Sequence, residues 1–333
     1  MPGPLRVLFD FHSENYELWN FPRPLYDTFV ANFPTVMFHY CTSHDDFRAH
    51  LPAAKVVFGQ WLRPDDLPLA SELTWYHTSA AGVERQLYPA FIERNISLTN
   101  SAGARAGAIA EFILGSLIAF NRQLPRIWRA QQERRWISAD VWNDYRRVPI
   151  LDGRRLVIAG LGGTGQETAR LAKAFGMEVW GTKRDPSTAI PWVDRIEGPG
   201  SLRDLLPGAL AVIDCLPSTP ETRGLFNAEL FARMDPITVF INVGRGATVD
   251  EAALIAALQS HSIRGAILDV FAAEPLPERS PLWTLENCMV VPHTSNIVDR
   301  FWEPTADLFY DNLRRYLMEL PLQNLVEPLG AGY

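Results

Sequence analysis

The chain has 333 residues, of which 47% are hydrophobic and 21% charged, and its formal net charge at pH 7 is −7. This composition is typical of a globular protein of about two domains. The negative net charge argues against a general binder of nucleic acids or anionic membranes, because such a surface repels phosphate groups.

The first hundred residues alternate apolar runs with amphipathic stretches. Runs rich in Val, Phe, Tyr and Thr predict strands at residues 6–11, 35–40, 55–60, 74–80 and 96–100. Helices are predicted between them at residues 24–33 and 45–51. This alternation favours a parallel sheet that is covered by helices on both faces.

The pattern changes after residue 100. Residues 101–135 predict one long, Ala-rich helical stretch, with a break near Pro125. Strands and helices then alternate again, with strands predicted at 154–160, 177–182, 210–217, 238–244, 264–271 and 288–293. Apolar spacing predicts a last helix at 300–320. The chain thus divides into two α/β units, and the last helix can return to the first of them.

Cysteine usage and hydropathy bound the remaining classes. Cys41, Cys215 and Cys288 form no CxxC pair, so the sequence indicates neither a disulfide framework nor a metal site such as zinc. The N-terminus lacks the pattern of a signal peptide. The apolar run 109–120 is too short to span a bilayer and contains a glutamate. We expect a cytoplasmic protein in which this run is a buried helix.

A glycine-rich turn follows the predicted strand at 154–160. It reads Gly160-Leu-Gly162-Gly163-Thr164-Gly165 and opens a helix, which is the context that a dinucleotide fold requires. Glycines let the backbone approach a pyrophosphate, and the N-terminus of the helix offers unpaired N–H groups to that anion. We predict that Gly160, Gly162, Gly163, Thr164 and Gly165 bind a dinucleotide cofactor.

The end of the next strand bears on cofactor choice. An NAD site usually places Asp or Glu there to hold the ribose hydroxyls, whereas this chain has Thr182, Lys183 and Arg184. A cation at this position would pair with the 2′-phosphate of NADP, and Thr182 could add a hydrogen bond. We predict a preference for NADP(H), with NAD(H) as the alternative. Two other interpretations stay open, namely that Asp185 is the ribose acid or that the Lys-Arg pair is simply solvated.

Polar side chains also stand at the ends of three later strands. Arg245 follows the strand at 238–244, Asp269 and Glu274 stand at the end of the next, and His293 ends the third. Each has an ordinary explanation by itself, as a capping, loop or surface residue. Ligands of open parallel sheets bind at the carboxyl ends of the strands, so the convergence of these residues predicts a catalytic site.

Several segments, in order, resemble the D-isomer-specific 2-hydroxyacid dehydrogenases, which include the glyoxylate/hydroxypyruvate reductases. They are GLGGTG, LPSTPETRGLF, FINVGRGATVDEAAL, GAILDVFAAEPLP and VVPHTSN. The resemblance is strong over the last two thirds of the chain, and the first hundred residues match mainly in pattern, through HTSAAGVERQ. Glu274 argues against a formate dehydrogenase, in which a Gln pairs with the histidine.

The resemblance implies an NAD(P)-dependent reductase of small 2-keto acids, with glyoxylate, hydroxypyruvate or a bulkier acid as substrate. His293 would be the acid/base, Glu274 would hydrogen-bond its ring, and Arg245 would bind the substrate carboxylate. The substrate would contact His293, Arg245, Trp61 and the backbone N–H groups of Ala81, Gly82 and Val83. Further cofactor contacts would be Leu216, Pro217, Thr222, Val243, Gly244, Asp269 and Ser295.

The family fold implies two Rossmann-like or flavodoxin-like parallel-sheet domains with an active-site cleft between them. Residues 1–101 plus 300–333 would form a discontinuous substrate-binding (catalytic) domain, and residues 102–299 the dinucleotide-binding Rossmann domain. Residues 102–135 match the dimerisation helix, so a homodimer is expected. Trp61 would face the substrate side chain, and Trp136 and Trp142 the pocket of the neighbouring subunit; alternatively, these tryptophans are packing residues.

One alternative to the enzyme is a dinucleotide-sensing interaction protein on the same fold, similar to the corepressors related to this family. Such a protein can retain the catalytic residues, so turnover is the property that discriminates between the two.

Overall fold

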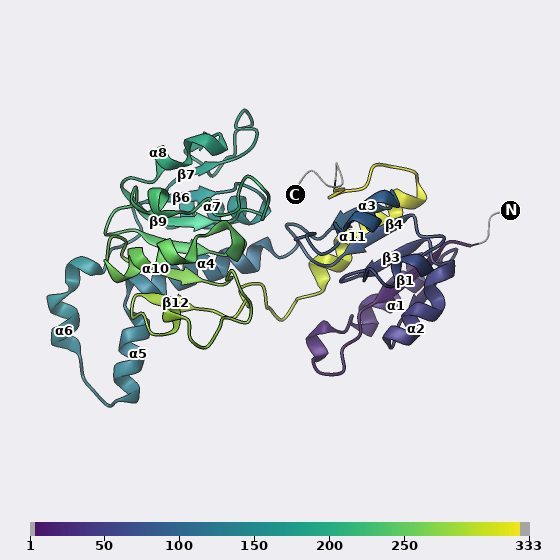
Figure 1. Ribbon diagram of the computed structural model, residues 1–333, viewed down its shortest axis with the longest axis horizontal. Helices are drawn as coiled ribbons and strands as arrows, with labels where there is room; N and C mark the ends of the chain where they lie inside the picture. Colours follow the sequence, from purple (N-terminus) through teal and green to yellow (C-terminus); the bar gives the residue numbers. More distant parts are fainter. Residues whose placement is uncertain (1–3, 327–333) are drawn as a thin grey trace. The chain divides into compact units, whose positions relative to one another are not determined.

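The computed structural model describes residues 4–326 (Figure 1). The chain divides into two compact units, one formed by Met1–Arg105 with Val298–Tyr333 and the other by Ala106–Ile297. The sequence places these boundaries at 101/102 and 299/300. Each unit is built on a parallel sheet, which confirms the predicted fold class of two parallel-sheet α/β domains.

The first unit holds a five-stranded sheet of order β2-β1-β3-β4-β5. Its strands are β1 (Arg6–Asp10), β2 (Met37–Tyr40), β3 (Val56–Gly59), β4 (Trp75–Thr78) and β5 (Ser97–Asn100). Its helices are α1 (Arg23–Asn32), α2 (His44–His50), α3 (Pro89–Glu93) and α11 (Glu303–Leu317). All five strands predicted for this region are confirmed.

Alternating side chains of the strands divide the core of the first unit into two layers. Phe9 and Phe58 pack with α1 and α11 on one face of the sheet. Leu8 and Val57, their neighbours along the strands, pack with α2 and α3 on the other face. Helix α11 therefore completes the first unit, because its buried Phe309 stacks on Phe58 with ring centroids 4.2 Å apart.

The second unit holds a seven-stranded sheet of order β12-β11-β10-β9-β6-β7-β8. Its strands are β6 (Arg155–Ala159), β7 (Glu178–Thr182), β8 (Arg195–Glu197), β9 (Ala209–Asp214), β10 (Val239–Asn242), β11 (Gly265–Leu268) and β12 (Cys288–Val290). Its helices are α4 (Ala106–Asn121), α5 (Leu124–Gln132), α6 (Ser138–Asn143), α7 (Gly163–Ala174), α8 (Leu202–Leu205), α9 (Ala228–Phe231) and α10 (Glu251–Gln259). The chain moves outward from β6 to β8 and then restarts at β9 on the other side of β6. The strand order thus reverses between β6 and β9, which is where such sheets bind ligands.

The predicted break near Pro125 in the helical stretch 101–135 is confirmed, because two helices, α4 and α5, occupy this stretch. Gln123 adopts a left-handed conformation with φ of +56°, which an α-helix cannot continue. Pro125 lies in the first turn of α5, where a missing N–H group is tolerated. Helix α4 buries its apolar face against α7, as predicted for the run 109–120.

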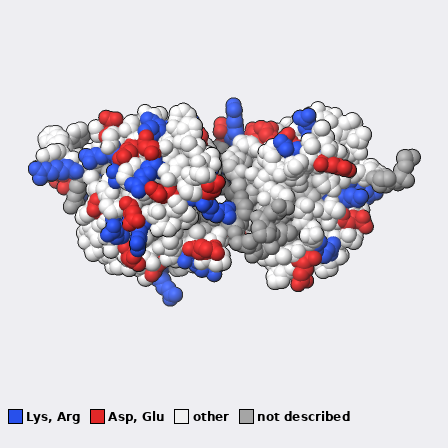
Figure 2. Space-filling model, turned by 90° about the horizontal axis from the view of Figure 1, so that it is seen from above, with Lys and Arg blue, Asp and Glu red and all other residues white. Residues whose placement is uncertain are grey.

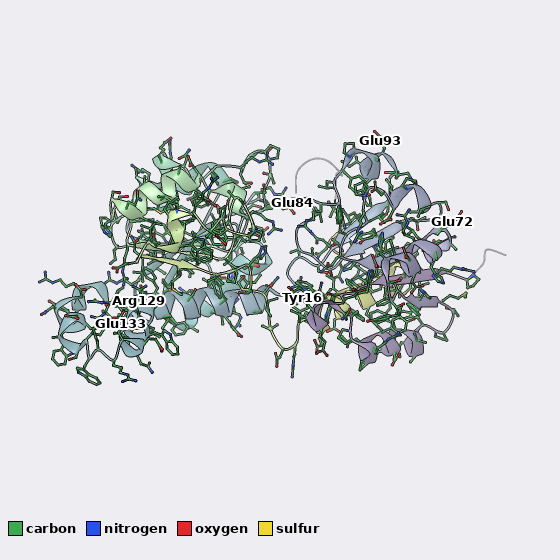
Figure 3. All side chains as sticks on the ribbon, turned by 60° about the horizontal axis from the view of Figure 1, so that its bottom comes forward. Tyr16, Glu72, Glu84, Glu93, Arg129 and Glu133 are labelled. Carbon is green, nitrogen blue, oxygen red and sulfur yellow. The ribbon has the colours of Figure 1, made fainter. Side chains whose placement is uncertain are left out.

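Helices α5 and α6 extend away from the sheet of the second unit (Figure 1), and in Figure 3 Arg129 marks α5 and Glu133 the residue directly after it. Among the described helices, none has both the length and the apolar content needed to cross a membrane. Acidic and basic side chains are interspersed over the face shown in Figure 2, in keeping with the mixed charge of the sequence.

Candidate active site

The predicted glycine turn connects β6 to α7 and fits a bound pyrophosphate. Gly160 has φ of +96°, which favours glycine. A Cβ atom on Gly165 would lie 2.2 Å from the carbonyl oxygen of Gly160, so only glycine lets α7 start this close to β6. A Cβ atom on Gly162 would meet no atom within 4 Å, so its outer side is open.

The first turn of α7 offers unpaired donors beside this open side. Gly162 precedes the helix and has no side chain to cap it. The helical hydrogen bonds begin at the N–H group of Gln166, which donates to the carbonyl oxygen of Gly162. The N–H groups of Gly163, Thr164 and Gly165 are therefore those that a helix leaves without an internal partner, and they suit a phosphate group.

Three predicted cofactor residues meet where β6, β9 and β10 end. A Cβ atom on Gly160 would lie 3.1 Å from the Leu216 side chain, and one on Gly244 would lie 2.6 Å from the Leu216 carbonyl oxygen. Thr222 Oγ1 donates to the Pro217 carbonyl oxygen at 2.6 Å and fixes the turn after Leu216. Val243 lies next to this junction, and its N–H group donates to the Asp214 carbonyl oxygen.

Strand β7 ends at Thr182, in register with Ala159, so Lys183 lies level with the first glycine of the turn. Thr182 is buried and its hydroxyl accepts a hydrogen bond from the Gly160 N–H group at 3.4 Å. Lys183 is partly exposed and Arg184 is exposed. Within the part of the chain that the structure describes, neither cationic side chain forms a hydrogen bond or an ion pair.

Asp185, the alternative ribose acid, is already engaged by a neighbour. Its Oδ1 atom accepts hydrogen bonds from the N–H group of Ser187 at 3.0 Å and from the Ser187 hydroxyl at 2.6 Å. These hydrogen bonds, together with the charge of Lys183, lower the pKa of the Asp185 carboxyl group. The carboxylate therefore stabilises its own turn.

His293 and Glu274 form the contact that their sequence motifs predict. His293 Nδ1 lies 2.8 Å from Glu274 Oε2, and both side chains are partly exposed to solvent. The other carboxylate oxygen, Oε1, accepts from the N–H group of Phe271 at 3.0 Å. Glu274 is thus held from both sides, and the ring of His293 is left with Nε2 as the nitrogen that can exchange a proton with a substrate.

Asp269 holds the loop that carries the histidine. It is buried at the end of β11 and accepts from the N–H groups of Thr294 at 2.8 Å and Ser295 at 3.1 Å. The Ser295 hydroxyl donates to its other oxygen at 2.5 Å. Asp269 and Ser295 are predicted cofactor contacts. In the structure they form hydrogen bonds with each other and fix the backbone directly after His293.

Arg245 stands between β10 and a short 3-10 turn, Gly246–Thr248. Its carbonyl oxygen accepts from Asn242 Nδ2 at 3.1 Å and from Thr248 Oγ1 at 2.6 Å. Its guanidinium Nη1 donates to the Gly244 carbonyl oxygen at 2.8 Å. A Cβ atom on Gly246 would lie 1.9 Å from the carbonyl carbon of Phe271, so this turn packs directly against the segment before Glu274.

In the first unit, the predicted carboxylate-binding loop follows β4. The carbonyl oxygens of Ser79, Ala80 and Ala81 accept from Arg105 Nη2, the Ser101 N–H group and Asn100 Nδ2, respectively. Within this unit, the described residues provide no hydrogen-bond acceptor for the N–H groups of Ala81, Gly82 and Val83. Trp61 lies beside the same loop, since its Nε1 donates to the Arg85 carbonyl oxygen at 2.9 Å.

Arg105 is a positioning residue of this loop that the sequence does not reveal. Its guanidinium is mostly buried, donates to Thr305 Oγ1 at 3.0 Å and lies 4.5 Å from the ring centroid of Phe301. Burial lowers the pKa of Arg105 to about 10, so the group remains charged at neutral pH. It therefore ties the loop to α11 and places a positive charge behind it.

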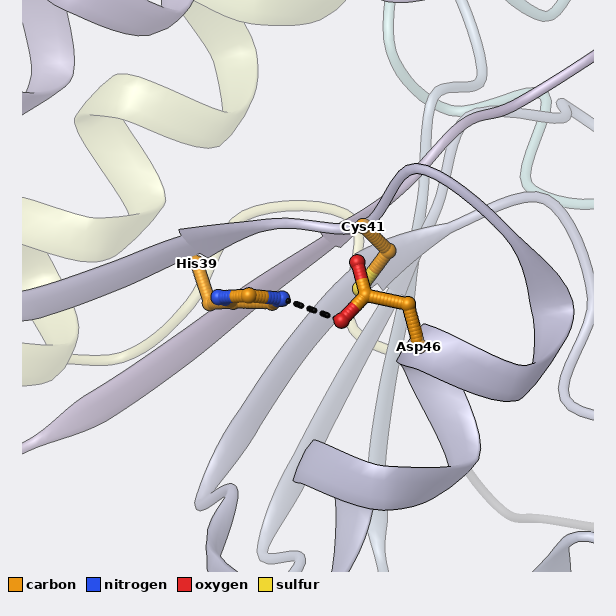
Figure 4. Close-up of side chains that lie close together, drawn as sticks. All are labelled: His39, Cys41 and Asp46. Carbon is orange, nitrogen blue, oxygen red and sulfur yellow. Dashed lines mark hydrogen bonds and ion pairs between the residues drawn. The ribbon is translucent and has the colours of Figure 1, made fainter.

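Three side chains that could bind a metal ion lie close together at the end of β2 (Figure 4). The ligand atoms of His39, Cys41 and Asp46 lie within 4.8 Å of one another. Ser43 caps α2 by accepting from the N–H group of Asp46, and Asp46 Oδ2 accepts in return from the N–H group of Thr42. The Oδ1 atom of Asp46 lies 2.9 Å from His39 Nε2. Burial raises the pKa of the Cys41 thiol, which disfavours a thiolate. The hydrogen bonds of the helix cap account for this group without a metal.

Comparisons with known proteins agree with the geometry. Residues 114–295 match the model of the "D-isomer specific 2-hydroxyacid dehydrogenase, NAD binding domain" family. Glyoxylate/hydroxypyruvate reductase B of Yersinia pestis is 30% identical over 314 residues, which cover 92% of this chain and 95% of that protein. D-3-phosphoglycerate dehydrogenase of Synechocystis is 32% identical over 266 residues, which cover 78% of this chain but only 46% of that relative.

A solved structure extends the likeness over nearly the whole chain. The D-isomer specific 2-hydroxyacid dehydrogenase of Xanthobacter autotrophicus, in complex with NADPH and MES, is 30% identical and superposes with a TM-score of 0.77. The superposition covers 98% of this chain and 99% of that one. The chain therefore belongs to the D-isomer-specific 2-hydroxyacid dehydrogenase family, whose members are NAD(P)-dependent enzymes.

Proposed function

We propose that the protein is an NADP(H)-preferring reductase of small 2-keto acids, such as glyoxylate, hydroxypyruvate or a bulkier relative. The observation that carries this proposal is the 2.8 Å contact between His293 Nδ1 and Glu274 Oε2. The pair stands after two strands at the carboxyl edge of a sheet whose glycine turn fits a dinucleotide. A lone histidine could be a capping residue, whereas one whose ring is fixed by an acid is arranged for proton transfer.

A bound nicotinamide dinucleotide supplies the hydride for such a reaction. His293 then gives the proton on Nε2 to the carbonyl oxygen of the keto acid, and Glu274 stabilises the protonated ring through Nδ1 beforehand. Because Phe271 N–H holds Glu274, the acid keeps its orientation while the ring changes charge. In the reverse direction the neutral ring accepts the proton of the hydroxy acid.

Two sets of hydrogen-bond donors would orient the substrate. Arg245 presents a guanidinium, which binds a carboxylate through two parallel hydrogen bonds, at the end of β10. The N–H groups of Ala81, Gly82 and Val83 form the second set, on a loop that Arg105 and Asn100 hold in place. Trp61 beside this loop would contact the side chain of the keto acid and limit its size.

The preference for NADP(H) rests on the end of β7. Lys183 directly follows the strand and Arg184 is exposed beside it, while Asp185 is engaged by Ser187. A 2′-phosphate would give these two cations an anionic partner, and a bare ribose would not. The relative from Xanthobacter autotrophicus, whose structure contains NADPH, supports the same choice.

A substrate panel with both cofactors tests the proposal. Purified protein should oxidise NADPH faster than NADH when glyoxylate, hydroxypyruvate, pyruvate or phenylpyruvate is added, and the loss of reduced-cofactor absorbance measures the rate. The proposal fails if neither cofactor is oxidised with any of these acids. Tight NADPH binding without turnover would instead favour the dinucleotide-sensing alternative.

We further propose that α5 and α6 mediate a homodimer. Trp128, Trp136 and Trp142 are 65%, 93% and 71% exposed, respectively, on a part of the unit that extends from its sheet. Such apolar exposure marks an interaction surface, and symmetric homodimers are the commonest assemblies. Light scattering should show a dimer for the native protein and a monomer for Trp128→Ser combined with Trp136→Ser. Trp192→Ser, at an exposed position outside these helices, should remain dimeric, and a monomeric native protein would contradict the proposal.

A further inference from the structure

A buried carboxyl group lies where β9 ends, next to the reversal of strand order. Asp214 has no solvent exposure, and its Oδ1 accepts from the N–H group of Leu216 at 2.9 Å. Its Oδ2 is in hydrogen-bond contact with the hydroxyl of Thr248, a residue 34 positions later. The same hydroxyl oxygen lies 2.6 Å from the carbonyl oxygen of Arg245. One hydroxyl group therefore connects Asp214 to the backbone of the proposed substrate arginine.

Whether both contacts of the Thr248 hydroxyl can be hydrogen bonds depends on the protonation state of Asp214. A threonine hydroxyl has one hydrogen to donate, and the Arg245 carbonyl oxygen can only accept. If Asp214 is ionised, two acceptors compete for that single hydrogen and one close contact is left without a proton. If Asp214 is protonated, it donates to Thr248 Oγ1, which donates to the Arg245 carbonyl oxygen. The geometry of two close contacts at Thr248 thus fits the protonated acid.

The surroundings of Asp214 also favour the protonated acid. Burial raises the pKa of Asp214 to about 7, although the hydrogen bonds from Thr248 and Leu216 and the charge of Arg245 act in the opposite direction. Arg245 is the cation that faces this carboxyl group. The adjacent Cys215 thiol has its own pKa raised by burial and by Asp214, so it remains neutral.

We propose that protonated Asp214 is a positioning residue. It donates a hydrogen bond to Thr248, and Thr248 in turn donates to the Arg245 carbonyl oxygen, which holds the backbone of Arg245 in the conformation that binds the keto acid. The proposal rests on the proposed function in one respect, namely that Arg245 binds the substrate carboxylate. Loss of the proton leaves the Arg245 carbonyl oxygen with Asn242 Nδ2 and the Thr248 N–H group as donors, and weakens the link between the turn Gly246–Thr248 and β9. Substrate affinity then falls as Asp214 ionises, while the proton transfer by His293 is untouched.

Asp214→Asn tests the proposal, because an asparagine has the shape of a protonated aspartic acid. Its amide can donate to Thr248 and its oxygen can accept from Leu216, at every pH. The native state of the wild type keeps the Asp214 proton up to a pH of about 7, whereas the unfolded chain releases it at the usual carboxyl value. Stability from this site is therefore greatest in acid and is lost as the pH rises through about 7. Thermal unfolding of the wild type should show this decline, and Asp214→Asn should reduce it.

Kinetics provide the second readout. Between about pH 6 and about pH 8.5, the KM of the wild type for the keto acid should rise at least about threefold, and that of Asp214→Asn should stay nearly constant. The kcat should respond to pH in the same way in both, because Asp214 takes no part in the proton transfer by His293. Thr248→Val should raise KM at every pH, and Thr248→Ser, which keeps the hydroxyl, should restore it.

The outcomes separate this proposal from the proposed function. If the wild type reduces no keto acid, the function fails, but the unfolding profiles still decide whether Asp214 holds a proton. Parallel unfolding profiles for wild type and Asp214→Asn would overturn the proposal, as would a KM that rises equally in both. Should Asp214→Asn not fold, carbon-13 NMR of the aspartate carboxyl groups in the wild type decides. A spectrum in which every aspartate is ionised at about pH 5 would overturn the proposal.

Discussion

His293→Ala should abolish keto-acid reduction while the protein still binds NADPH. The imidazole is the proposed source of the proton for the carbonyl oxygen, and a positioned acid of this kind contributes roughly 10²- to 10⁴-fold to the rate. His293 is not among the predicted cofactor contacts, which include the glycine turn and the end of β7. We therefore expect a fall in kcat of that size with little change in the Kd for NADPH, as measured by steady-state rates and by fluorescence titration of the cofactor.

Glu274→Gln provides a graded comparison for the same site. Its amide oxygen can still accept the hydrogen bond from Nδ1, but a neutral amide does not stabilise the protonated ring as a carboxylate does. Its loss of kcat should be smaller than that of His293→Ala, and the double variant should lose no more than the alanine variant alone. A His293→Ala protein that keeps most of its turnover would refute the assigned role. A parallel loss of NADPH binding would show damage to the fold instead.

The features that the sequence predicts well are those that local chemistry dictates. Strands buried on both faces of a parallel sheet appear as short apolar runs, and β6 and β9 are examples. The glycine turn is recognisable because a side chain at Gly165 would clash with the backbone of Gly160, so only glycine fits there. His293 and Glu274 are 19 positions apart, and their motifs identify them before any contact is known.

The missed features depend on partners that are distant in the sequence. Strand β8 has three residues, Arg195–Glu197, and is held at the edge of the sheet by pairing with β7 and not by apolar content. Arg105 resembles an ordinary solvent-facing residue of a helical stretch, because its partner Thr305 lies 200 positions later.

Asp214 illustrates the same limit inside the candidate site. In the sequence it is one acid at the end of an apolar run, where the pattern predicts nothing more than the end of a strand. The proposed role of Asp214 depends on the pairing of β10 with β9, because β10 places the Arg245 turn and the Thr248 hydroxyl against the carboxyl group. A signal that could find it is a carboxylate placed in a run of residues that would otherwise all be buried.

Lys183→Asp combined with Arg184→Ala should shift the cofactor preference from NADPH towards NADH. Each charge-assisted contact to a phosphate is worth about 1.5–3 kcal/mol, so losing two should weaken NADPH binding by roughly a hundredfold or more. The new carboxylate after β7 would repel a 2′-phosphate and could accept hydrogen bonds from ribose hydroxyls. The Kd values for NADPH and NADH, measured by titration, give the ratio directly.

Arg154→Asp combined with Arg233→Ala is the matched control, because it changes the net charge equally at exposed positions that precede β6 and β10. These residues lie at the amino ends of the strands, away from the glycine turn, so the control should keep the native ratio of the two Kd values. An unchanged ratio in the Lys183 and Arg184 variant would refute the phosphate site. If Asp185→Ala instead weakened NADH binding more than NADPH binding, Asp185 would be the ribose acid, and its hydrogen bonds to Ser187 would have to open when the cofactor binds.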